Sequence, residues 1–381
     1  MAEYLTNTND LTLVANAIRT KGGTTELLTY PDEFVTAIQA IQTGTKLQII
    51  VTVTSGATVT ATKGSLSVSG TSVNGTCTLT VPEAGEWTVS ATLGGQTSNS
   101  NIVNVVSSYD TSLAFISTTL NDNSWEAIRG ISDAGQGANY WSIGDRKAVT
   151  LNGTVGHLSL SNYTTYAFII GFNHNASVEG ANRIHFQLAK TALSGGKDVC
   201  RCDRRYSPNN GWSPAGASYF VMNTRNTNSG GWKSSQMRTN ICGTSLSSYS
   251  GTIIAVIPAA LRAVIKSVTK YTDNTGGGST AASAVTATTD YFFLLSEFEV
   301  YGSISYGNTN EKNKQAQYAY YSAGNSKIKY KHNGTNTAAY WWLRSPIAGF
   351  SDYFVGVNTG GTNDFDSFAH YSLGFAPGFC V

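Results

Sequence analysis

Apolar residues recur at a characteristic spacing in each part of this chain, and that spacing limits what each part can form. Over residues 46–106 they alternate with polar residues, as at Ile49 and Val51. Successive side chains of a strand point to opposite faces, so a repeat of two indicates strands with one buried face. Glycine or proline turns separate the runs. We therefore expect a small β-sandwich over residues 45–107, with Trp87 in its core.

Residues 1–44 follow the period of a helix instead. One helix is predicted after Asp10, a good N-cap residue, and a second begins near Pro31, which suits a first helical turn. Their apolar residues would be Leu11, Val14, Ala17 and Ile18 in the first helix and Phe34, Val35, Ile38 and Ile41 in the second. Two short helices bury little surface. The hairpin therefore needs a partner: the next domain, another copy or a larger assembly.

Residues 108–381 carry six of the seven tryptophans, most of them beside glycine or serine. Large rings in loop-rich sequence indicate loops that are packed into a core. We expect a strand near residues 253–257, a short amphipathic piece after Pro258, and a buried strand in "TDYFFLLSEFEVYG" that leads into a helix or turn. The run "DNTGGGSTAASA" is predicted to be a flexible loop tip. The expected fold class is mainly β with irregular loops, an α+β fold.

Composition argues against several kinds of partner. Only 13% of the 381 residues are charged, the formal net charge is +2, and no run of lysine and arginine occurs. Nucleic acid is therefore not expected as a partner. No stretch approaches eighteen apolar residues, and the first residues lack the pattern of an export signal, so we expect neither a membrane span nor export.

No catalytic or metal-binding motif stands out. The sequence lacks G-x-S-x-G, H-E-x-x-H and a phosphate-binding loop, and its five histidines are far apart in the sequence. The five cysteines form no C-x-x-C pair, so buried thiols are expected. Cys200 and Cys202 would share a face of a strand, which leaves a metal or redox role open. We predict that the chain is not an enzyme and holds no cofactor or metal.

Two segments near the N-terminus resemble parts of known proteins. The run "LTLVANAIRTKGGTTELLTYPDEFVTAIQAI" resembles a short element of tail and fibre proteins from bacteriophages that infect Gram-positive gut bacteria. The run "VNGTCTLTVPEAGEWTVSATLGG" resembles the bacterial immunoglobulin-like modules of phage tail proteins and surface adhesins. These resemblances imply an attachment element over residues 1–44 and an immunoglobulin-like spacer over residues 45–107.

The C-terminal part carries the most specific resemblance. The segments "YWWLRSP", "FVGVNTGG" and "GFAPGFCV", with "SIGDRKAVTLNG" and "FFLLSEFEVYG" upstream, resemble the C-type-lectin-fold variable proteins of diversity-generating retroelements. In that family a reverse transcriptase copies a template with errors at adenines, which changes codons of the Asn type on a fixed lectin scaffold. The changed positions form the ligand site. The resemblance implies a C-type-lectin-like variable ligand-binding domain over residues 108–381.

The resemblance divides the last forty residues into a frame and a variable face. The frame positions should be buried or turn-forming: Trp341, Trp342, Leu343, Arg344, Ser345, Pro346, Phe354, Val357, Gly360, Gly361, Gly374, Pro377, Gly378 and Phe379. The variable positions should be exposed on one face and contact the ligand: Phe350, Asp352, Tyr353, Asn358, Asn363, Asp364, Phe365, Asp366, Ser367, Phe368, His370, Tyr371 and Leu373. Four positions fit either class: Ala348, Gly356, Thr359 and Phe375.

The residues themselves support this division. The run "GTNDFDSFAHYS" mixes aromatic rings with short polar groups and has neither helical nor strand periodicity. Rigid rings with short polar neighbours on loops are typical of antibody-like binding surfaces. The alternative is that the rings point inward and the acids are ordinary solvated loop residues. Asp364 and Asp366 would make half of a calcium site, but the tripeptides of calcium-dependent lectins are absent, so we expect calcium-independent binding.

The function that follows is a diversified receptor-binding protein at a phage tail tip. Its expected partners are a bacterial surface receptor, protein or glycan, other phage tail proteins and further copies of itself, since fibre-tip proteins are commonly trimers. The expected location is the virion. One alternative is a bacterial adhesin at the cell surface with the same lectin-like fold. Another is an oxidase of the formylglycine-generating type, for which Cys200 with Cys202 or Cys242 is the one indication.

Overall fold

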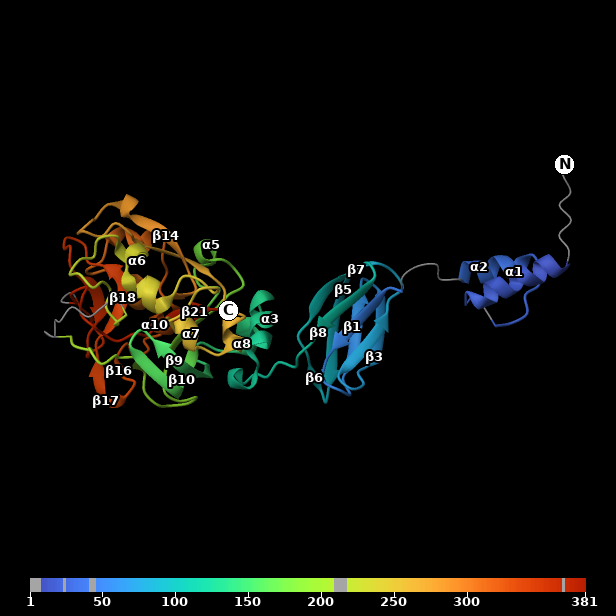
Figure 1. Cartoon of the computed structure of the whole chain (residues 1–381), viewed down its shortest axis with the longest axis horizontal. Coiled ribbons are helices and arrows are strands. Elements are labelled where there is room, and N and C mark those ends of the chain that lie inside the picture. Colours follow the sequence, from blue (N-terminus) through green and yellow to red (C-terminus); the bar gives the residue numbers. More distant parts are fainter. Residues whose placement is uncertain (1–7, 23–24, 41–45, 209–217, 365–366) are drawn as a thin grey trace. The chain divides into compact units, whose positions relative to one another are not determined.

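The chain divides into two compact units, Met1–Phe115 and Ile116–Val381. The computed structural model describes residues 8–22, 25–40, 46–208, 218–364 and 367–381 (Figure 1). Strands hold 36% of the residues and helices 21%, so the expected mainly β, α+β class is correct. Among the described residues, no helix is both long and apolar enough to cross a membrane.

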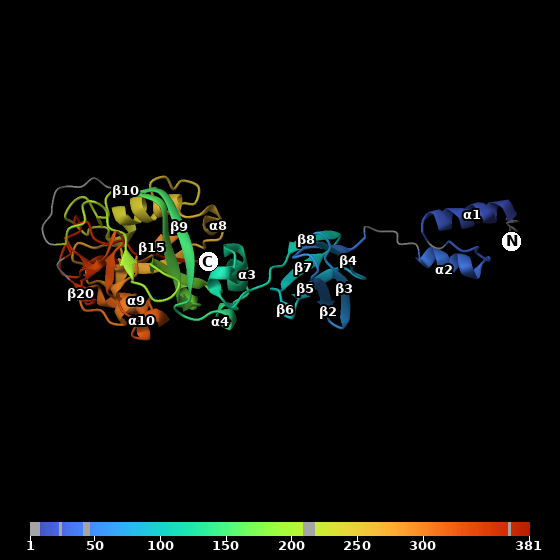
Figure 2. The same ribbon diagram turned by 90° about the horizontal axis from the view of Figure 1, so that it is seen from below.

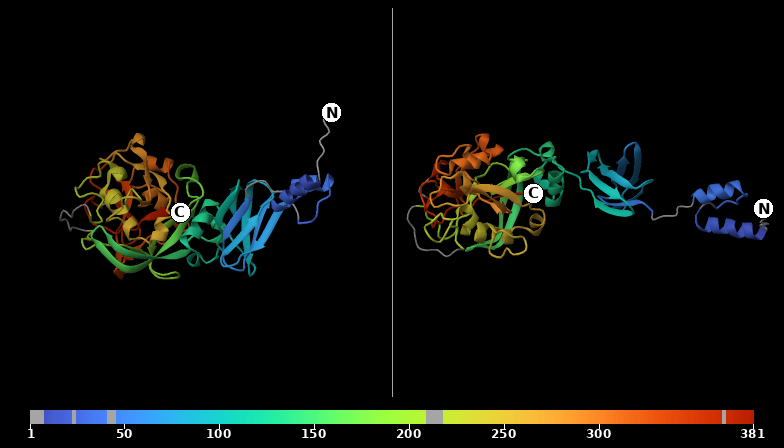
Figure 3. Two further views of the ribbon diagram at one scale, coloured as in Figure 1. Left: turned by 45° about the vertical axis from the view of Figure 1, so that its right-hand side comes forward. Right: turned by 90° about the horizontal axis from the view of Figure 1, so that it is seen from above.

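The N-terminal helices α1 (Thr8–Thr20) and α2 (Asp32–Ala40) lie side by side (Figures 2 and 3). The helix α1 begins two residues before the predicted cap at Asp10. The buried residues of this pair are Ala15, Ile18, Phe34 and Ala37. Most of the predicted apolar faces instead stay exposed, including Val14, Val35 and Ile38, because two helices cover only one narrow stripe of each other. The predicted apolar residue 41 lies outside the described residues.

Two sheets enclose one core over residues 48–112. The first contains the strands β4 (Thr76–Thr80), β1 (Gln48–Thr52) and β8 (Ser108–Ser112), in that order. The second has the order β3 (Leu66–Thr71), β2 (Thr58–Lys63), β5 (Gly85–Leu93) and β6 (Gln96–Thr97), and β7 (Asn101–Val105) also pairs with β5. The predicted alternation is confirmed, since Ile49, Val51 and Trp87 are buried in the shared core.

The sandwich extends further along the chain than the predicted boundary after residue 107. Strand β8 pairs in parallel with β1, and Gln48 lies opposite Ser108 in the register. Leu113 is buried in the core, and Phe115 bridges to Ser98. The boundary prediction was wrong because a parallel partner far away in the sequence leaves no local signal at residues 108–112.

The larger unit is built around a five-stranded sheet. Its strand order is β15 (Phe292–Phe293), β21 (Gly378–Cys380), β11 (Ile184–Lys190), β10 (Leu158–Phe172) and β9 (Arg146–Val155). The long hairpin of β9 and β10 appears in green in Figures 2 and 3. All seven residues of β11 are buried. The sheet brings the end of the chain, at β21, beside strands that are far away in the sequence.

Smaller elements surround this sheet. The smaller sheets contain β12 (Val199–Cys200), β16 (Lys329–Lys331) and β17 (Gly334–Ala339); β13 (Val268–Asp273) and β14 (Val285–Asp290); and β18 (Trp341–Pro346), β19 (Phe354–Val357) and β20 (Asn363–Asp364). The helices and helical turns are η1 (Leu120–Asp122), α3 (Trp125–Asp133), α4 (Gly137–Tyr140), α5 (Ala176–Glu179), α6 (Gly231–Ser234), η2 (Met237–Cys242), α7 (Ile253–Val256), α8 (Ala259–Arg262), η3 (Ala282–Ala284), α9 (Glu297–Tyr301), η4 (Thr309–Asn313) and α10 (Ala319–Ser322).

Two local predictions in this unit had different outcomes. The strand expected near residues 253–257 is wrong, because this short apolar run forms the helical turn α7, which contacts β9. Periodicity alone does not separate a buried strand from a buried helical turn in so short a run. The buried strand leading into a helix is confirmed, since β15 precedes α9.

The extent of the sandwich gives a direct test. We expect a chain of residues 46–115 to unfold cooperatively in urea. A chain of residues 46–107 should unfold at a clearly lower urea concentration, because it lacks the β8 ladder and buried Leu113. Tyr109→Ala in the longer chain is the control, since it removes only an exposed side chain and should change stability by less than about 0.5 kcal/mol. Equal urea midpoints for the two lengths would contradict the assignment of β8.

Candidate functional site

The candidate site stands on the three-stranded sheet of β18, β19 and β20. Every residue of β18 and β19 is buried. Strand β18 pairs antiparallel with β19, and β19 pairs with β20 through Gly356 and Val357. The segment before β19 and the segment that begins at Ser367 lie next to each other, because Tyr353 forms a bridge with Phe368. The sheet therefore supports two loops that come from different parts of the tail.

The tryptophan pair of β18 is part of the core. Trp341 and Trp342 are both fully buried, as predicted. The indole Nε1 of Trp341 donates to the carbonyl oxygen of Lys327 at 2.9 Å, and that of Trp342 donates to Phe220 at the same distance. A buried indole needs such an acceptor, because an unpaired N–H costs free energy in the core. The two rings connect β18 to two other segments of the unit.

Arg344 lies in the centre of the unit and is fully buried. Its guanidinium donates to the carbonyl oxygen of Leu294 at 2.8 Å, to Thr272 Oγ1 at 2.8 Å, and to both carboxylate oxygens of Glu299. A carboxylate, a backbone carbonyl and a hydroxyl thus satisfy this buried charge. Glu299 is oriented by a capping box at the start of α9, where Ser296 Oγ accepts from the Glu299 N–H and Glu299 accepts from the Ser296 N–H.

Lys270 extends this ion pair into a buried network. Its ammonium donates to Glu299 Oε1 at 2.9 Å, to Glu179 Oε2 at 2.6 Å and to the Tyr318 hydroxyl at 2.8 Å. Away from water, the two cations thus face Glu299 and, when it is ionised, Glu179. We call Lys270, Glu179, Glu299 and Arg344 the buried ion network.

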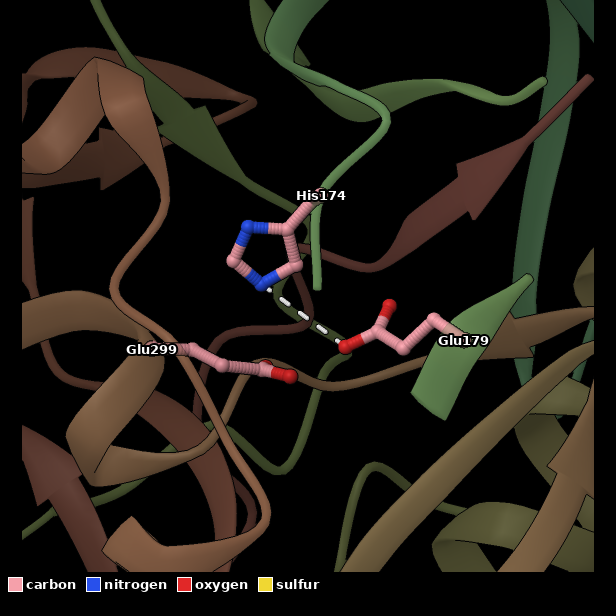
Figure 4. Close-up of side chains that lie close together, drawn as sticks. All are labelled: His174, Glu179 and Glu299. Carbon is pink, nitrogen blue, oxygen red and sulfur yellow. Dashed lines mark ion pairs between the residues drawn. The ribbon is translucent and has the colours of Figure 1, made fainter. Parts of the chain in front are cut away.

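The histidine and the two glutamates in Figure 4 are the one group of potential metal ligands found within the described residues. Their ligand atoms, from His174, Glu179 and Glu299, lie within 4.8 Å of one another. The Lys270 ammonium already contacts both carboxylates of this group. A metal ion would have to compete with that bound cation, so the geometry fits an internal ion network better than a metal centre.

The network shifts the pKa of its members in opposite directions. Burial alone would raise the pKa of Glu299, but the charges of Arg344 and Lys270 outweigh it and hold that pKa well below its ordinary range. Burial raises the pKa of Glu179 to about 7, although Lys270 opposes the rise. Burial also lowers the pKa of His174 to about 3, so the ring is neutral near pH 7.

The remaining predicted frame residues are mostly buried. A Cβ at Gly374 would lie 2.2 Å from the sulfur of Cys200, so only glycine fits there. Pro377 is buried, and its carbonyl oxygen accepts from the Leu188 N–H at 3.0 Å. The other buried frame residues are Leu343, Ser345, Pro346, Phe354, Val357, Gly378 and Phe379. Gly360 and Gly361 lie instead at the turn that follows β19, with Gly361 at φ +84°.

The side chain of Asn228 holds the loop that precedes β19. This fully buried side chain donates from Nδ2 to the carbonyl oxygens of Phe350 and Tyr353, each at 2.8 Å. Its Oδ1 accepts from the Gly277 N–H at 2.7 Å. The glycine run around Gly277 is therefore hydrogen-bonded and packed against the site, in contrast to the predicted flexible tip. A buried amide with two carbonyl acceptors fixes the path of the loop.

Five aromatic side chains form a continuous cluster on these loops. The ring centroids of Phe350 and Tyr353 are 5.7 Å apart, and those of Tyr353 and Phe368 are 4.3 Å apart. Phe368 in turn contacts His370 at 5.7 Å and Tyr371 at 5.2 Å. Phe350 is 52% exposed, and the other four are half-buried. We call these five residues the ring surface.

The remaining predicted variable positions are divided between surface and interior. Asp352 and Asp364 are half-buried, and Asp352 accepts from Asn226 Nδ2 at 3.3 Å. Ser367 is only 2% exposed and Leu373 is fully buried, so for these two the predicted exposure was wrong. Ser367 lies directly over Gly356, where a Cβ would come within 2.6 Å of its hydroxyl oxygen, and Leu373 also packs beside Gly356.

Two predicted variable asparagines make structural hydrogen bonds. Asn358 builds the turn after β19, because its Oδ1 accepts from the backbone N–H groups of Gly360 and Thr362. Asn363 donates from Nδ2 to the buried carboxylate of Glu297 at 2.6 Å. Both side chains are half-buried. These contacts orient the loop, so we expect their direct part in binding to be smaller than that of the rings.

Six further predicted positions complete this comparison. Phe365 and Asp366 lie outside the described residues. Of the four positions that fit either class, Gly356 and Phe375 are buried, Ala348 is half-buried and Thr359 is exposed.

All five cysteines are free and buried, as predicted. The sulfurs of Cys200 and Cys202 lie 3.9 Å apart, and the hydrogen bond to Cys200, together with burial, raises the pKa of Cys202. Cys242 is buried in η2. Of the five histidines, His174 and His185 come together, with ring centroids 5.6 Å apart. The ring of Tyr318 stacks on His174 at 3.7 Å, so this contact is part of the core.

A comparison with protein-family models found one match in this region. Residues 217–381 match a family that is described as a domain of unknown function, DUF6273. The match covers β13 to β21, and with them the ring surface, Asn228 and three members of the buried ion network. No curated protein matches the chain.

Sequence reasoning missed three residues that organise the site. Glu299 could have been found, because "SEFE" fits the capping-box pattern of a serine followed three residues later by glutamate. Lys270 and Asn228 had no local signal, since each acts through partners that are distant in the sequence.

The buried tryptophan gives the first test of the site. We expect Trp342→Ala to lower the free energy of unfolding by about 3–5 kcal/mol, because it leaves a cavity beneath β19 and removes an indole hydrogen bond. Chemical denaturation measures the change. Phe350→Ala is the matched surface control and should stay within about 0.5 kcal/mol of the parent protein. An unchanged midpoint for Trp342→Ala would show that the ring is not part of the core.

Glu179 gives a test through pH. Its pKa is about 7 in the folded protein and 4.5 as an ordinary glutamate, so its contribution to stability is fully present below pH 4.5 and is lost as the pH rises through 7. Glu179→Gln cannot lose a proton. We therefore expect this variant to gain stability relative to the parent protein between these pH values, by up to about 3 kcal/mol. Titrating groups that do not contact Glu179 are common to both proteins and cancel in the difference. Urea unfolding at several pH values measures it, and a constant difference would contradict the raised pKa.

Proposed function

We propose that this chain is a receptor-binding protein whose ring surface recognises a bacterial surface receptor. The observation that carries the proposal is the unbroken series of ring contacts from Phe350 through Tyr353 and Phe368 to His370 and Tyr371. Rings at a surface, one of them exposed and the others half-buried, supply large contact area with little loss of side-chain freedom. Polar groups beside them, such as Asp352, provide directional hydrogen bonds.

The support beneath the rings favours binding as well. The loop of Phe350 and Tyr353 is held by Asn228, and the sheet below it is held by buried Trp342 and Arg344. A surface that is already ordered loses less entropy when it binds. A scaffold whose stability comes from buried residues also tolerates substitutions at the surface. This separation is what a diversified binding face requires.

The proposal includes the architecture that the sequence resemblance implies. Residues 116–381 would be a C-type-lectin-like variable domain, and the sandwich an immunoglobulin-like spacer. The exposed apolar side chains of α1 and α2, among them Leu13, Val14 and Ile38, support an assembly role, because such a pair needs a further partner. We propose that the partner is a phage tail, and that copies of the chain assemble there as a homo-oligomer. A reverse-transcriptase gene beside a near-copy of the tail sequence that differs at adenines would establish the retroelement.

Substitution of the rings tests the binding surface. We expect Phe350→Ala to weaken binding to host cells by roughly 2 kcal/mol while leaving the melting temperature unchanged, because its side chain is 52% exposed. The combined Tyr353, Phe368 and Tyr371 alanine variant should lose binding altogether. The measurement is the binding of labelled protein to a panel of Gram-positive gut bacteria.

Two comparisons keep this test specific. Tyr109→Ala removes an exposed ring from the sandwich and should leave binding unchanged. The combined variant is to be checked for an intact cooperative unfolding transition before binding is measured. The proposed binding surface would be contradicted if the folded triple variant kept its affinity for the bacteria, or if Tyr109→Ala lost as much affinity as the triple variant.

A further inference from the structure

A second candidate site lies in the larger unit, beside α3. A pocket of about 510 Å³ that opens widely to solvent is lined there by charged and polar residues, including Arg129, Asp133, Arg183, Lys266 and Tyr291. Its volume is in the range of small-molecule sites. It shares no residue with the ring surface. Figures 1 and 2 place α3 at one side of this unit and the strands β18 and β20 toward the other.

The side chains of the cavity carry an excess of positive charge. Three cations, Arg129, Arg183 and Lys266, face one carboxylate, Asp133. Asp133 pairs with both Arg129, at 2.7 Å, and Lys266, at 2.5 Å. Burial alone would raise the pKa of Asp133, but these two cations outweigh it and lower that pKa. The single carboxylate is therefore ionised and already shared between two partners.

Two of the cations are held in place by backbone acceptors. Arg129 donates from its guanidinium to the carbonyl oxygen of Val264 at 2.8 Å. The Lys266 ammonium donates to the carbonyl oxygen of Asn182 at 2.6 Å, and the Asn182 side chain donates to the carbonyl oxygen of Asp133 at 2.8 Å. These contacts connect α3, the segment before β11 and the segment before β13. The cavity wall is thus fixed before any ligand arrives.

Arg183 is the cation without an anionic partner. Its Nε is buried and has no hydrogen-bond partner, and one terminal guanidinium nitrogen lies 3.9 Å from the Cys380 sulfur. Among the described residues, no carboxylate lies within ion-pair distance of it. The guanidinium lies over Gly180, where a Cβ would come within 2.7 Å of Nε. Its position is therefore restricted. The guanidinium is planar, and the spacing of its N–H donors matches the oxygens of an oxyanion.

We propose that this cavity binds the oxyanion group of a small ligand, a phosphate or a carboxylate, with Arg183 as its main contact. Arg129 and Lys266 supply further positive charge at the wall, and Tyr291 adds a ring and a hydroxyl. Charge-assisted bonds from a guanidinium to an oxyanion are among the stronger hydrogen bonds in proteins. The site goes beyond the proposed receptor surface, because it uses other residues on another part of the unit.

The test is isothermal titration calorimetry of the full chain with inorganic phosphate, a sugar phosphate and glucuronate at low, constant ionic strength. We expect one binding event per chain with at least one of these ligands. Arg183→Gln should weaken it by at least about tenfold, because one charge-assisted contact is lost. Arg183→Lys keeps the charge without the fork and should lie between. Arg225→Gln removes the same charge from an exposed position outside the cavity and should bind like the parent protein.

The outcomes separate clearly. Preference for the phosphates or for glucuronate would each support the site and identify the oxyanion. Absence of binding with all three ligands, or equal weakening by Arg183→Gln and Arg225→Gln, would overturn it. Melting curves without ligand show whether Arg183→Gln is folded, and Arg183→Lys decides the question if it is not. The combined ring-surface variant should retain the anion affinity of the parent protein, so failure of the receptor proposal remains distinguishable from failure of this one.

Discussion

The bidentate pair of Arg344 with Glu299, extended by Lys270 and Glu179, is the interaction on which the larger unit depends. It joins β18, α9, β13 and α5, four elements that come from widely separated parts of the sequence. Removing these charged groups from water is costly, and the cost is offset because opposite charges face each other and every nitrogen of the guanidinium donates a hydrogen bond. Loss of Arg344 or of Glu299 would leave an uncompensated buried charge, so the elements that carry them have to assemble together.

The consequence for function is a rigid buried sheet beneath loops whose amino-acid sequence can change. Strand β18 is held by the bonds of Arg344 in the ion network and by the indole hydrogen bonds of Trp341 and Trp342. The path of the loop that carries Phe350 and Tyr353 is set by Asn228, and the turn of Asn358 connects β19 to β20. Residues that give stability and residues that face solvent are therefore largely different residues. Such a division lets a surface change in sequence without loss of the fold.

Not every residue of the tail obeys that division. Ser367 and Leu373 occur in a sequence context like that of the rings, yet both pack around Gly356 beneath β19. Asn363 lies at the surface but donates to buried Glu297, which also accepts three backbone N–H groups from residues 305–307. In an irregular loop there is no period that tells inward from outward positions, so composition and resemblance assign the segment to the surface but not each residue. The contacts of the fold make that final assignment.

The sequence by itself determined the features that depend on local pattern. The alternation around Ile49 and Val51 predicted the sandwich, and the helical spacing predicted α1 and α2. The frame that the resemblance implies placed the two tryptophans of β18 in the core, where they are buried. Only the tertiary structure decided the features that depend on distant partners. Strand β8 belongs to the sandwich because it pairs with β1, a strand far away in the sequence. Lys270 contacts Glu179 and Glu299 only when β13, α5 and α9 pack together. The cavity of Arg183 has the same origin. Hydrophobic periodicity is a property of neighbouring residues, whereas a balanced buried charge or a lined cavity is a property of residues that become neighbours through folding.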